Sequence, residues 1–448
     1  MTRTRPALSL AALLVSAALA ACAAPRAVSP GAPAAAIAAP PTAMATPGAV
    51  PRTVLAAASP LELLESWPAG TTLDHEDLRD AAAVWPLLFD SAKERIDLAQ
   101  FYYSNEPGSA LEACVQALER AAARGVRVRV LAEEKFYSTY PETLERFAHQ
   151  KNFEVRRLDW KQAAGGGILH AKYFLIDSKQ AVLGSQNFDW RSLSQIQELG
   201  VRFRAPAAVG ALQAVFDADW AAAVGEKLPA PTLEAASAAP ALEAAGDSRI
   251  ALVASPPHTL PAGVQWDLPA VVKLIDAATR TVRVQVLTYR PTGRGGEGFT
   301  QLDEALRRAA ERGVAVSLLV SDWAMGKGSI DHLRALSLFG REQRLARRPG
   351  VLVKVLVIPT LEKCIPFARV AHAKYLVVDG AEAFVSTSNW ERDYFFESRN
   401  VGLIISGGGV PGQVDAFFES TWRSGYTQEV TPEGTVPPVP NKTCGGGR

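Results

Sequence analysis

Two ten-residue stretches of this sequence carry a histidine and a lysine in the same local setting. ILHAKYFLID spans residues 168–177 and VAHAKYLVVD spans residues 370–379, so the two histidines lie 202 residues apart. Both stretches have the apolar composition of a buried strand. Side chains at positions i and i+2 of a strand point to the same face, so each stretch presents its histidine and its lysine together.

These pairs, His170 with Lys172 and His372 with Lys374, could act on a phosphodiester. One neutral imidazole can attack phosphorus in line and become a phosphohistidine, while the other, protonated, can donate to the leaving oxygen. The lysines can hold the non-bridging oxygens, whose charge matters in the transition state. No H-E-x-x-H motif or compact cluster of acidic residues accompanies them, and we therefore expect no metal and no other cofactor.

Polar residues recur at matched distances after each histidine. Asp177 and Asp379 follow by seven residues, an odd offset that places them at the strand end or on its other face. Within the catalytic motif we expect these two carboxylates to support the structure rather than to carry protons. A polar turn follows in each half, and we expect its amides and hydroxyls to bind the substrate: Asn187, Asn389, Ser185 and Thr387.

Two glutamates, Glu198 and Glu397, each precede an apolar, strand-like segment. A carboxylate there could accept the Nδ1–H of a histidine and fix its tautomer, so both are candidate orienting residues. The alternative is that both motifs are ordinary core strands with buried lysines and satisfied histidines. Two copies with aspartate and asparagine at the same spacings favour the catalytic interpretation, because an unpaired lysine on an apolar strand would be costly.

The elements that must position these groups follow one order twice. The hydrophobic pattern predicts, in the two halves, strands over 96–103, 126–131, 153–158, 282–289, 314–320 and 351–358, with helices over 109–124 and 300–312. This alternation predicts two α/β domains, and the repeat predicts that they pack face to face about a pseudo-two-fold axis with the site between them. The expected boundaries are a first domain over 59–230, a linker over 231–246 and a second domain over 247–426.

Both ends of the chain differ from this core. Residues 1–21 combine two arginines with a short apolar run, which predicts an export signal. Leu-Ala-Ala-Cys then resembles a lipobox in which Cys22 would carry a lipid, although a plain secretory signal is the alternative. We therefore expect a cell-envelope lipoprotein, held to the membrane through Cys22, or a secreted protein. Residues 22–58 and 427–448 are rich in proline with alanine or glycine, and we expect a disordered tether and a disordered tail.

The overall composition excludes some classes of protein. The chain has 48% hydrophobic residues and a net charge of +1, so it is not a strongly basic nucleic-acid binder, and any site for a polyanion must be local. Besides Cys22 it has Cys114, Cys364 and Cys444, which allow at most one disulfide and exclude a disulfide-rich scaffold. Cys114 lies in a helical pattern and is expected to be a small buried hydrophobe. Nothing indicates an obligate protein partner.

Aromatic residues that follow the predicted strands could line a groove in which bases stack. They are Phe101, Tyr102, Tyr103, Phe136, Tyr137, Tyr140 and Trp323. Packing in the core and at its rim is the alternative. We favour the groove only for Tyr103, Phe136 and Tyr137.

The repeated His-x-Lys-x-x-x-x-Asp motif, each copy followed by a small-residue turn with asparagine, resembles the phospholipase D superfamily over about residues 59–430. GSQNFDWRSLSQIQELGV, IPFARVAHAKY and TSNWERDYFFES are most similar to the branch of phospholipase D family members three and four. The animal proteins of this branch are endolysosomal 5′-exonucleases on single-stranded DNA and RNA, and lipid-directed activity is also ascribed to it. The resemblance implies two phospholipase D-like domains and a metal-independent phosphodiesterase.

The resemblance also implies roles for individual residues. It makes His170 and His372 the nucleophile and the acid/base, with the motif lysines and asparagines on the phosphate and the two glutamates as orienting carboxylates. Asp-Trp-Arg-Ser after Asn187 has no counterpart after Asn389, so the first motif is the more complete, and we name His170 the nucleophile. A lipobox-like signal and few cysteines replace the membrane anchor and several disulfides of the animal branch.

Two other functions stay open beside a nuclease. The chain could be a phospholipase or transphosphatidylase that acts on the membrane to which it is tethered. It could also be an inactive envelope-binding module, but neither motif has lost a residue. A near-neutral chain suits an exonuclease, which needs to grip only a few nucleotides at one end.

Overall fold

The computed structural model describes residues 59–292, 297–327, 330–434 and 444. These residues fall in a single compact unit. The predicted signal peptide over 1–21 and the predicted tether over 22–58 lie outside the described residues. Of the helices described, none combines the length and the apolar character that a membrane span requires.

The first half forms an eight-stranded sheet in the order β2-β1-β10-β8-β7-β3-β5-β6. The parallel pairs β3–β5 and β5–β6 sit at one end of it, and antiparallel pairs make up most of the rest. Its strands are β1 (Leu61–Ser66), β2 (Arg79–Asp80), β3 (Arg95–Gln100), β5 (Arg127–Glu133), β6 (Phe153–Leu158), β7 (Lys172–Ile176), β8 (Gln180–Gly184) and β10 (Glu198–Phe203), and the short β4 (Tyr103–Ser104) and β9 (Phe188–Asp189) pair separately.

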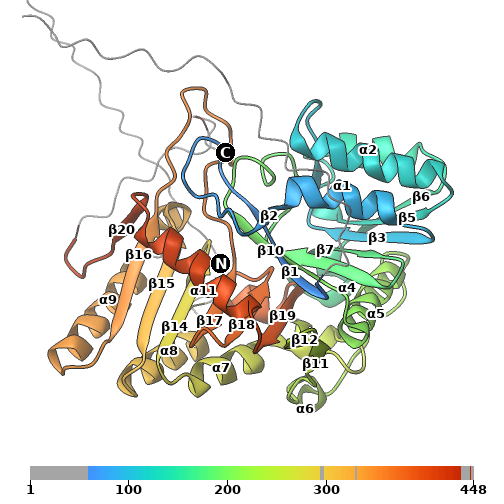
Figure 1. Cartoon of the computed structure of the whole chain (residues 1–448). Coiled ribbons are helices and arrows are strands. Elements are labelled where there is room, and N and C mark those ends of the chain that lie inside the picture. Colours follow the sequence, from blue (N-terminus) through green and yellow to red (C-terminus); the bar gives the residue numbers. More distant parts are fainter. Residues whose placement is uncertain (1–58, 293–296, 328–329, 435–443, 445–448) are drawn as a thin grey trace, which may run out of the picture. The chain divides into compact units, whose positions relative to one another are not determined.

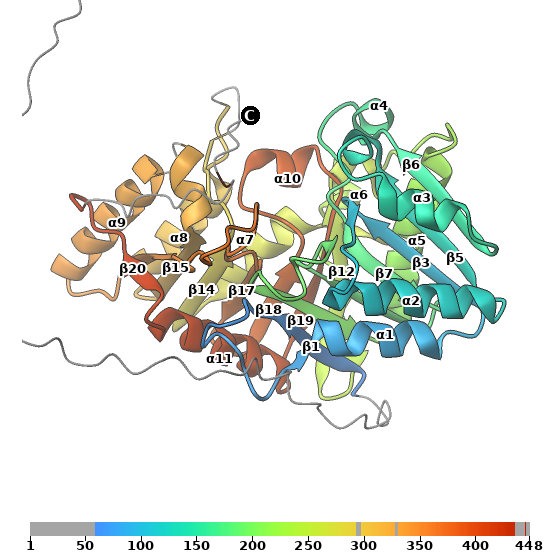
Figure 2. The ribbon, with the colours of Figure 1, turned by 90° about the horizontal axis from the view of Figure 1, so that it is seen from above.

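Helices cover both faces of this sheet. The amphipathic helices α1 (Ala81–Ser91) and α2 (Ala110–Ala123) lie side by side on one face, and α5 (Pro206–Ala222) lies on the other, as Figures 1 and 2 show. The face under α1 and α2 has its own apolar core, which contains Cys114. The shorter helices η1 (Glu134–Phe136), α3 (Glu142–Ala148) and α4 (Trp160–Ala164) connect the strands beyond β5.

The second half repeats this arrangement in a ten-stranded sheet, in which β13 pairs with β12 beside the path β11-β12-β19-β18-β17-β14-β15-β16-β20. Its strands are β11 (Glu243–Ala245), β12 (Ser248–Ser255), β13 (Gln265–Trp266), β14 (Thr281–Val286), β15 (Ala315–Ser321), β16 (Val351–Leu356), β17 (Tyr375–Val378), β18 (Glu382–Ser386), β19 (Asn400–Ser406) and β20 (Thr427–Glu429). Its helices are α6 (Leu233–Ala236), η2 (Pro257–Thr259), α7 (Asp267–Ala277), α8 (Gln301–Glu311), η3 (Asp322–Lys327), α9 (Ile330–Leu345), α10 (Arg392–Phe396) and α11 (Val410–Arg423).

The two halves share one apolar core. It runs from the face of the first sheet beneath α5 into both faces of the second sheet. The packing is reciprocal, because α5 contacts β12 of the second sheet and α11 contacts β1 of the first. The predicted pair of α/β domains related by a pseudo-two-fold is therefore confirmed, with a continuous core between the halves.

The structure corrects the predicted tail. β20, at the start of the segment predicted to be disordered, pairs antiparallel with β16, and the N–H of Val430 donates to the carbonyl of Val353 (2.9 Å). The hydroxyl of Ser337 on α9 also donates to the carbonyl of Val430 (2.6 Å). Residues 427–430 thus extend the second sheet, whereas 435–443 and 445–448 lie outside the described residues. The predicted linker over 231–246 contains α6 and β11.

Candidate active site

Backbone hydrogen bonds across the two halves hold both motif histidines in place. The N–H of His170 donates to the carbonyl of Arg399 (3.0 Å), and the N–H of His372 donates to the carbonyl of Gln197 (2.8 Å). Each acceptor lies 202 residues from its counterpart, as the two histidines do. The two contacts are therefore exchanged by the pseudo-two-fold, and neither half positions its own histidine without the other.

The imidazole of His170 is held by a neutral amide. Its Nδ1–H donates to Oδ1 of Asn400 (2.9 Å), whose Nδ2 donates to the carbonyl of Tyr394 (2.8 Å) and so fixes which end of the amide faces the ring. Nδ1 therefore carries the proton and Nε2 has the lone pair. Nζ of Lys172 lies 2.9 Å from Nε2, which confirms that the histidine and the lysine share a face.

The imidazole of His372 is held by a carboxylate instead. Its Nδ1 lies 2.8 Å from Oε2 of Glu198, and Oε1 of Glu198 accepts from the hydroxyl of Ser192 (3.0 Å). Glu198 is fully buried, whereas His372 keeps 9% of its surface. Burial raises the pKa of Glu198 to about 8. The Glu198–His372 pair consequently retains a proton at neutral pH.

The site contains four basic side chains, and burial disfavours the charged form of each. Burial, and then the neighbouring lysines, lower the pKa values of His170 and His372 well below the usual range. Burial also lowers the pKa of Lys172 well below its usual range and that of Lys374 to about 7. An entering phosphodiester anion would favour the protonated lysines, because an opposite charge stabilises the charged form.

The structure corrects one of the two glutamates. Glu397 lies outside the site, where it pairs with Arg392 and is 41% exposed at its side chain. Asn400 occupies the position beside His170 that we expected Glu397 to occupy. The spacing of 202 residues that relates the histidines also relates Glu198 to Asn400, so the register of the repeat contained this signal, and our choice of a carboxylate by residue type missed it.

The hydroxyls expected on the substrate lie behind the histidine partners. Ser185 is fully buried, and its Oγ accepts from the N–H of Leu199 (3.0 Å). Thr387 is also fully buried and donates to Oδ1 of Asn400 (2.9 Å). The structure therefore places these two residues where they orient the partners of the histidines, not where they would touch a phosphate.

The amides of Asn187 and Asn389 remain candidates for binding the substrate. Among the described residues, Oδ1 of each is buried without a hydrogen-bond partner. Nδ2 of Asn187 lies 3.5 Å from the hydroxyl of Tyr102. An amide in this position can offer N–H to a phosphate oxygen and its carbonyl oxygen to a hydroxyl or a water.

The two motif aspartates have the structural role expected of their odd offset. Asp177 and Asp379 lie just past β7 and β17, with φ of 52° and 55°. The carboxylate of Asp177 accepts the N–H groups of residues 93–95 at 2.8–3.0 Å, and Asp379 does the same for residues 279–281 at 2.7–2.9 Å. Each therefore fixes the start of the neighbouring strand and takes no part in the hydrogen bonds around the histidines.

The aromatic residues separate into core and rim. Tyr103 is fully buried in the first-half core, so its expected place in a groove was wrong. The ring of Phe101 lies 5.1 Å from that of His170 and 4.2 Å from that of Phe136. Tyr137 packs instead against the guanidinium of Arg157 (4.1 Å).

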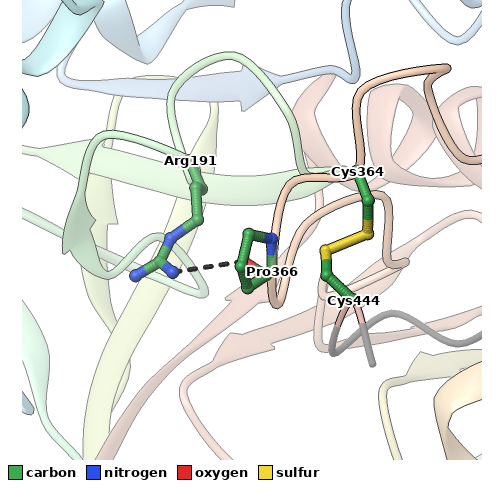
Figure 3. Close-up of a disulfide and its surroundings, with 4 residues drawn as sticks. All are labelled: Arg191, Cys364, Pro366 and Cys444. Atoms are coloured by element: carbon green, nitrogen blue, oxygen red, sulfur yellow. Dashed lines mark hydrogen bonds between the residues drawn. A yellow bond between two sulfur atoms is a disulfide. The ribbon is translucent and has the colours of Figure 1, made fainter. Parts of the chain in front are cut away.

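An arginine that we did not single out organises the rim. Arg191 is 6% exposed and forms an ion pair with Asp189 (2.6 Å), which also accepts from the hydroxyl of Tyr102 (2.7 Å). Its Nη1 donates to the carbonyl of Pro366 (3.2 Å), two residues from the disulfide between Cys364 and Cys444 (Figure 3). Cys114 is free and buried, as expected.

The described residues contain no group of three or more His, Cys, Asp or Glu side chains arranged to hold a metal ion. Lys172 and Lys374 place two amino groups beside the histidines of the described site.

Comparison with known proteins agrees with this geometry. A family model described as "Cardiolipin synthase, PLD-like domain" matches residues 87–220 and 271–422, once in each half. Phospholipase D Z of Dictyostelium discoideum is 31% identical over 397 residues, covering 83% of this chain and 91% of that protein. The 5′-3′ exonuclease PLD3 of Homo sapiens is 31% identical over 406 residues, covering 82% of this chain and 80% of that protein.

Among solved structures, phosphatidylserine synthase of Haemophilus influenzae matches with a TM-score of 0.56 and 13% identity, covering 78% of this chain and 85% of that one. At that identity the match supports the fold alone.

Proposed function

The chain belongs to the phospholipase D superfamily, and from this premise we propose that it is a phosphodiesterase that shortens single-stranded nucleic acid from the 5′ end through a phosphohistidine. One observation carries the proposal: two imidazoles are held reciprocally across the two halves, one by a neutral amide and one by a buried carboxylate. The direction of cleavage follows the name of the PLD3 relatives.

The difference between the two partners supports His170 as the nucleophile. Asn400 fixes the tautomer with a lone pair on Nε2, and the site lowers the pKa of this ring, so it is neutral and able to attack. Lys172 donates to the same Nε2 in the free site. A phosphate oxygen is a stronger acceptor and would draw the lysine away as the substrate binds.

The same difference supports His372 as the acid and then the base. The Glu198–His372 pair holds a proton up to about pH 8, which is what protonation of a leaving oxygen requires. In the first step the bond from Nε2 of His170 to phosphorus forms while the bond to the leaving oxygen breaks, and that oxygen takes the proton. In the second step a water gives its proton to His372, attacks phosphorus and releases His170.

We propose that Lys172, Lys374, Asn187 and Asn389 hold the phosphate and that no metal is needed. Two lysines of lowered pKa become charged as the anion arrives, and this supplies the stabilisation that a cation would otherwise give. Activity that survives a chelator would support this part, and loss of all turnover with a chelator would contradict it.

We also propose that the protein is exported and works in the cell envelope, held there by a lipid on Cys22. The charge and apolar pattern of residues 1–22 supports the export signal. The disulfide between Cys364 and Cys444 supports an oxidising compartment, since cytosolic proteins seldom keep one. Labelling with a fatty-acid analogue, lost in Cys22→Ser, tests the anchor.

The experiment for the reaction uses end-labelled single-stranded DNA and RNA beside vesicles of phosphatidylglycerol. We expect stepwise loss of nucleotides from the 5′ end and no release of the lipid headgroup. Cleavage of lipid alone would establish the rival phospholipase function. His372→Asn should accumulate phosphate on His170, because hydrolysis needs the second histidine; phosphate trapped on His372 in His170→Asn, and none in the converse variant, would reverse the two roles.

A further inference from the structure

We propose that partly exposed aromatic side chains beside His170 form a stacking subsite for the base of the nucleotide that stays bonded to this histidine. We call this set the aromatic ladder: Phe101, Phe136, Tyr102 and Tyr140. The inference rests on the proposed nuclease function. It adds that, of the two nucleotides at the scissile bond, the one bonded to His170 has its base held by these rings.

The rings of the ladder form a contiguous cluster that begins at the nucleophile. Phe101 lies 5.1 Å from the imidazole of His170 and 4.2 Å from Phe136, between ring centroids. Tyr102 lies 5.3 Å from Phe101 and 6.1 Å from Phe136, and it stacks on Tyr140 at 4.8 Å and 23°. All four side chains are partly exposed, so a ligand can reach each ring from solvent.

Buried polar groups hold the ladder in position. The carboxylate of Glu133 accepts the N–H of Leu169 (2.6 Å) and that of Lys135 (3.2 Å), and so joins the turn that carries Phe136 to the residue before His170. At the other end, the hydroxyl of Tyr102 donates to the buried Asp189. A platform fixed in this way loses little conformational entropy when a base stacks on it.

Cations accompany the rings. Nζ of Lys135 lies 6.0 Å from the ring centroid of Phe136, and the guanidinium of Arg191, which is paired with Asp189, lies 5.8 Å from that of Tyr140. Aromatic faces combined with positive charge suit a single-stranded nucleic acid, whose bases stack while its phosphates are neutralised. An acyl chain would gain nothing from these charges, so the ladder favours a nucleotide over a phospholipid.

The ladder exists on one side of the site only. β3 and β14 pair with the motif strands in the same register, which makes Leu287 and Thr288 the counterparts of Phe101 and Tyr102. Within the described part of the chain no aromatic ring packs on His372. In an in-line displacement the leaving group departs on the side opposite the nucleophile. A base held beside His170 therefore belongs to the nucleotide that remains on phosphorus.

The test uses the mature chain and oligonucleotides of thymidine with one abasic position, either at the 5′ end or next to it. Mass spectrometry of the His372→Asn intermediate first identifies which nucleotide is bonded to His170. We expect an abasic site at that nucleotide to lower kcat/KM of the wild type about ten-fold, and an abasic site at its neighbour to have a much smaller effect.

Two kinds of variant distinguish loss of stacking on the ladder from a general loss of structure. Phe136→Ala should lose about ten-fold in kcat/KM on the normal oligonucleotide and most of its sensitivity to the abasic site, and Phe136→Trp should restore both. Phe339, a partly buried ring that packs on Arg307 of α8, is the matched control, and Phe339→Ala should keep the full abasic effect.

Equal tolerance of both abasic positions by the wild type, on an oligonucleotide that it does cleave, would overturn the stacking subsite and leave the nuclease function standing. An abasic penalty at the nucleotide that leaves would overturn the assignment of sides. Failure to cleave any single-stranded oligonucleotide would overturn the proposed function and the subsite with it.

Discussion

Nδ1 of His372 lies 2.8 Å from Oε2 of Glu198, a residue of the other half of the chain. The equivalent contact of His170 is to the uncharged Asn400. A duplicated fold has thus kept the position of the histidine partner and changed its charge in one copy. This single difference gives one imidazole a partner that can hold a proton and the other a partner that cannot, which suits the two roles of a two-step displacement.

Glu198→Gln should lower kcat about 100-fold, because the pair can no longer retain the proton that the leaving oxygen needs. With Glu198, whose pKa is about 8, the acid form lasts to about that pH. Without it, the lowered pKa of His372 sets the limit, so the alkaline limb of the kcat–pH profile should move to lower pH. Glu397→Gln is the matched control. It removes a carboxylate that pairs with Arg392 away from the histidines, and it should stay within about three-fold of the wild type. An equal loss in both variants would contradict the assignment.

A second prediction concerns the interface. Arg399 and Asp219 form a fully buried ion pair between the halves (2.9 Å), and the pseudo-two-fold replaces it on the other side by Gln197 and Thr421 (2.9 Å). Asp219→Asn should lower the free energy of unfolding by about 3 kcal/mol, because it leaves a buried guanidinium uncompensated. The double variant Asp219→Thr/Arg399→Gln copies the neutral side and should recover at least half of that loss in urea unfolding. A double variant less stable than Asp219→Asn would show that the two sides are not interchangeable.

The sequence was sufficient for the repeat, the alternation of strands and helices along the chain and the two histidine–lysine pairs, because the apolar periodicity and the recurrence of the motif can be read without knowledge of tertiary contacts. The error at Glu397 came from choosing by residue type. Glu397 has the right chemistry and the wrong register, whereas Asn400, which follows Glu198 by the 202 residues of the repeat, is the residue that holds His170. Composition also could not show that residues 427–429 complete the edge of a sheet, since that strand is specified by β16.

Asp267 provides a pH-dependent prediction. It is fully buried at the start of α7, and burial raises its pKa to about 8. The native state therefore keeps a proton that the unfolded chain has lost, so this stabilisation is complete below about pH 4 and falls by roughly 1.4 kcal/mol per pH unit up to about pH 8. The urea midpoint of Asp267→Asn relative to the wild type should rise between pH 5 and 8. A difference in urea midpoint that stays constant over this pH range would contradict the raised pKa of Asp267.

A carboxylate next to the matching helix of the first half serves as a comparison. Asp80 precedes α1 as Asp267 begins α7, and burial also raises its pKa, but it is partly exposed. The urea midpoint of Asp80→Asn relative to the wild type should therefore rise by less between pH 5 and 8. A larger effect than that of Asp267→Asn would mean that burial is not the dominant cause.

The disulfide between Cys364 and Cys444 joins positions 80 residues apart, and it ties the end of the chain to the loop whose Pro366 accepts from Arg191. A bridge of that span restricts the unfolded chain by about 4 kcal/mol in the chain-entropy account. We expect reductant to lower the midpoint of thermal unfolding of the wild type to that of Cys364→Ser/Cys444→Ser, and to leave the double variant unchanged. Kinetically, kcat/KM on an oligonucleotide should fall more than kcat, since Arg191 borders the aromatic ladder and not the reacting histidines. Cys114→Ala, which removes the buried free thiol, should respond to reductant as the wild type does; a variant that no longer responds would place the redox effect on that thiol instead.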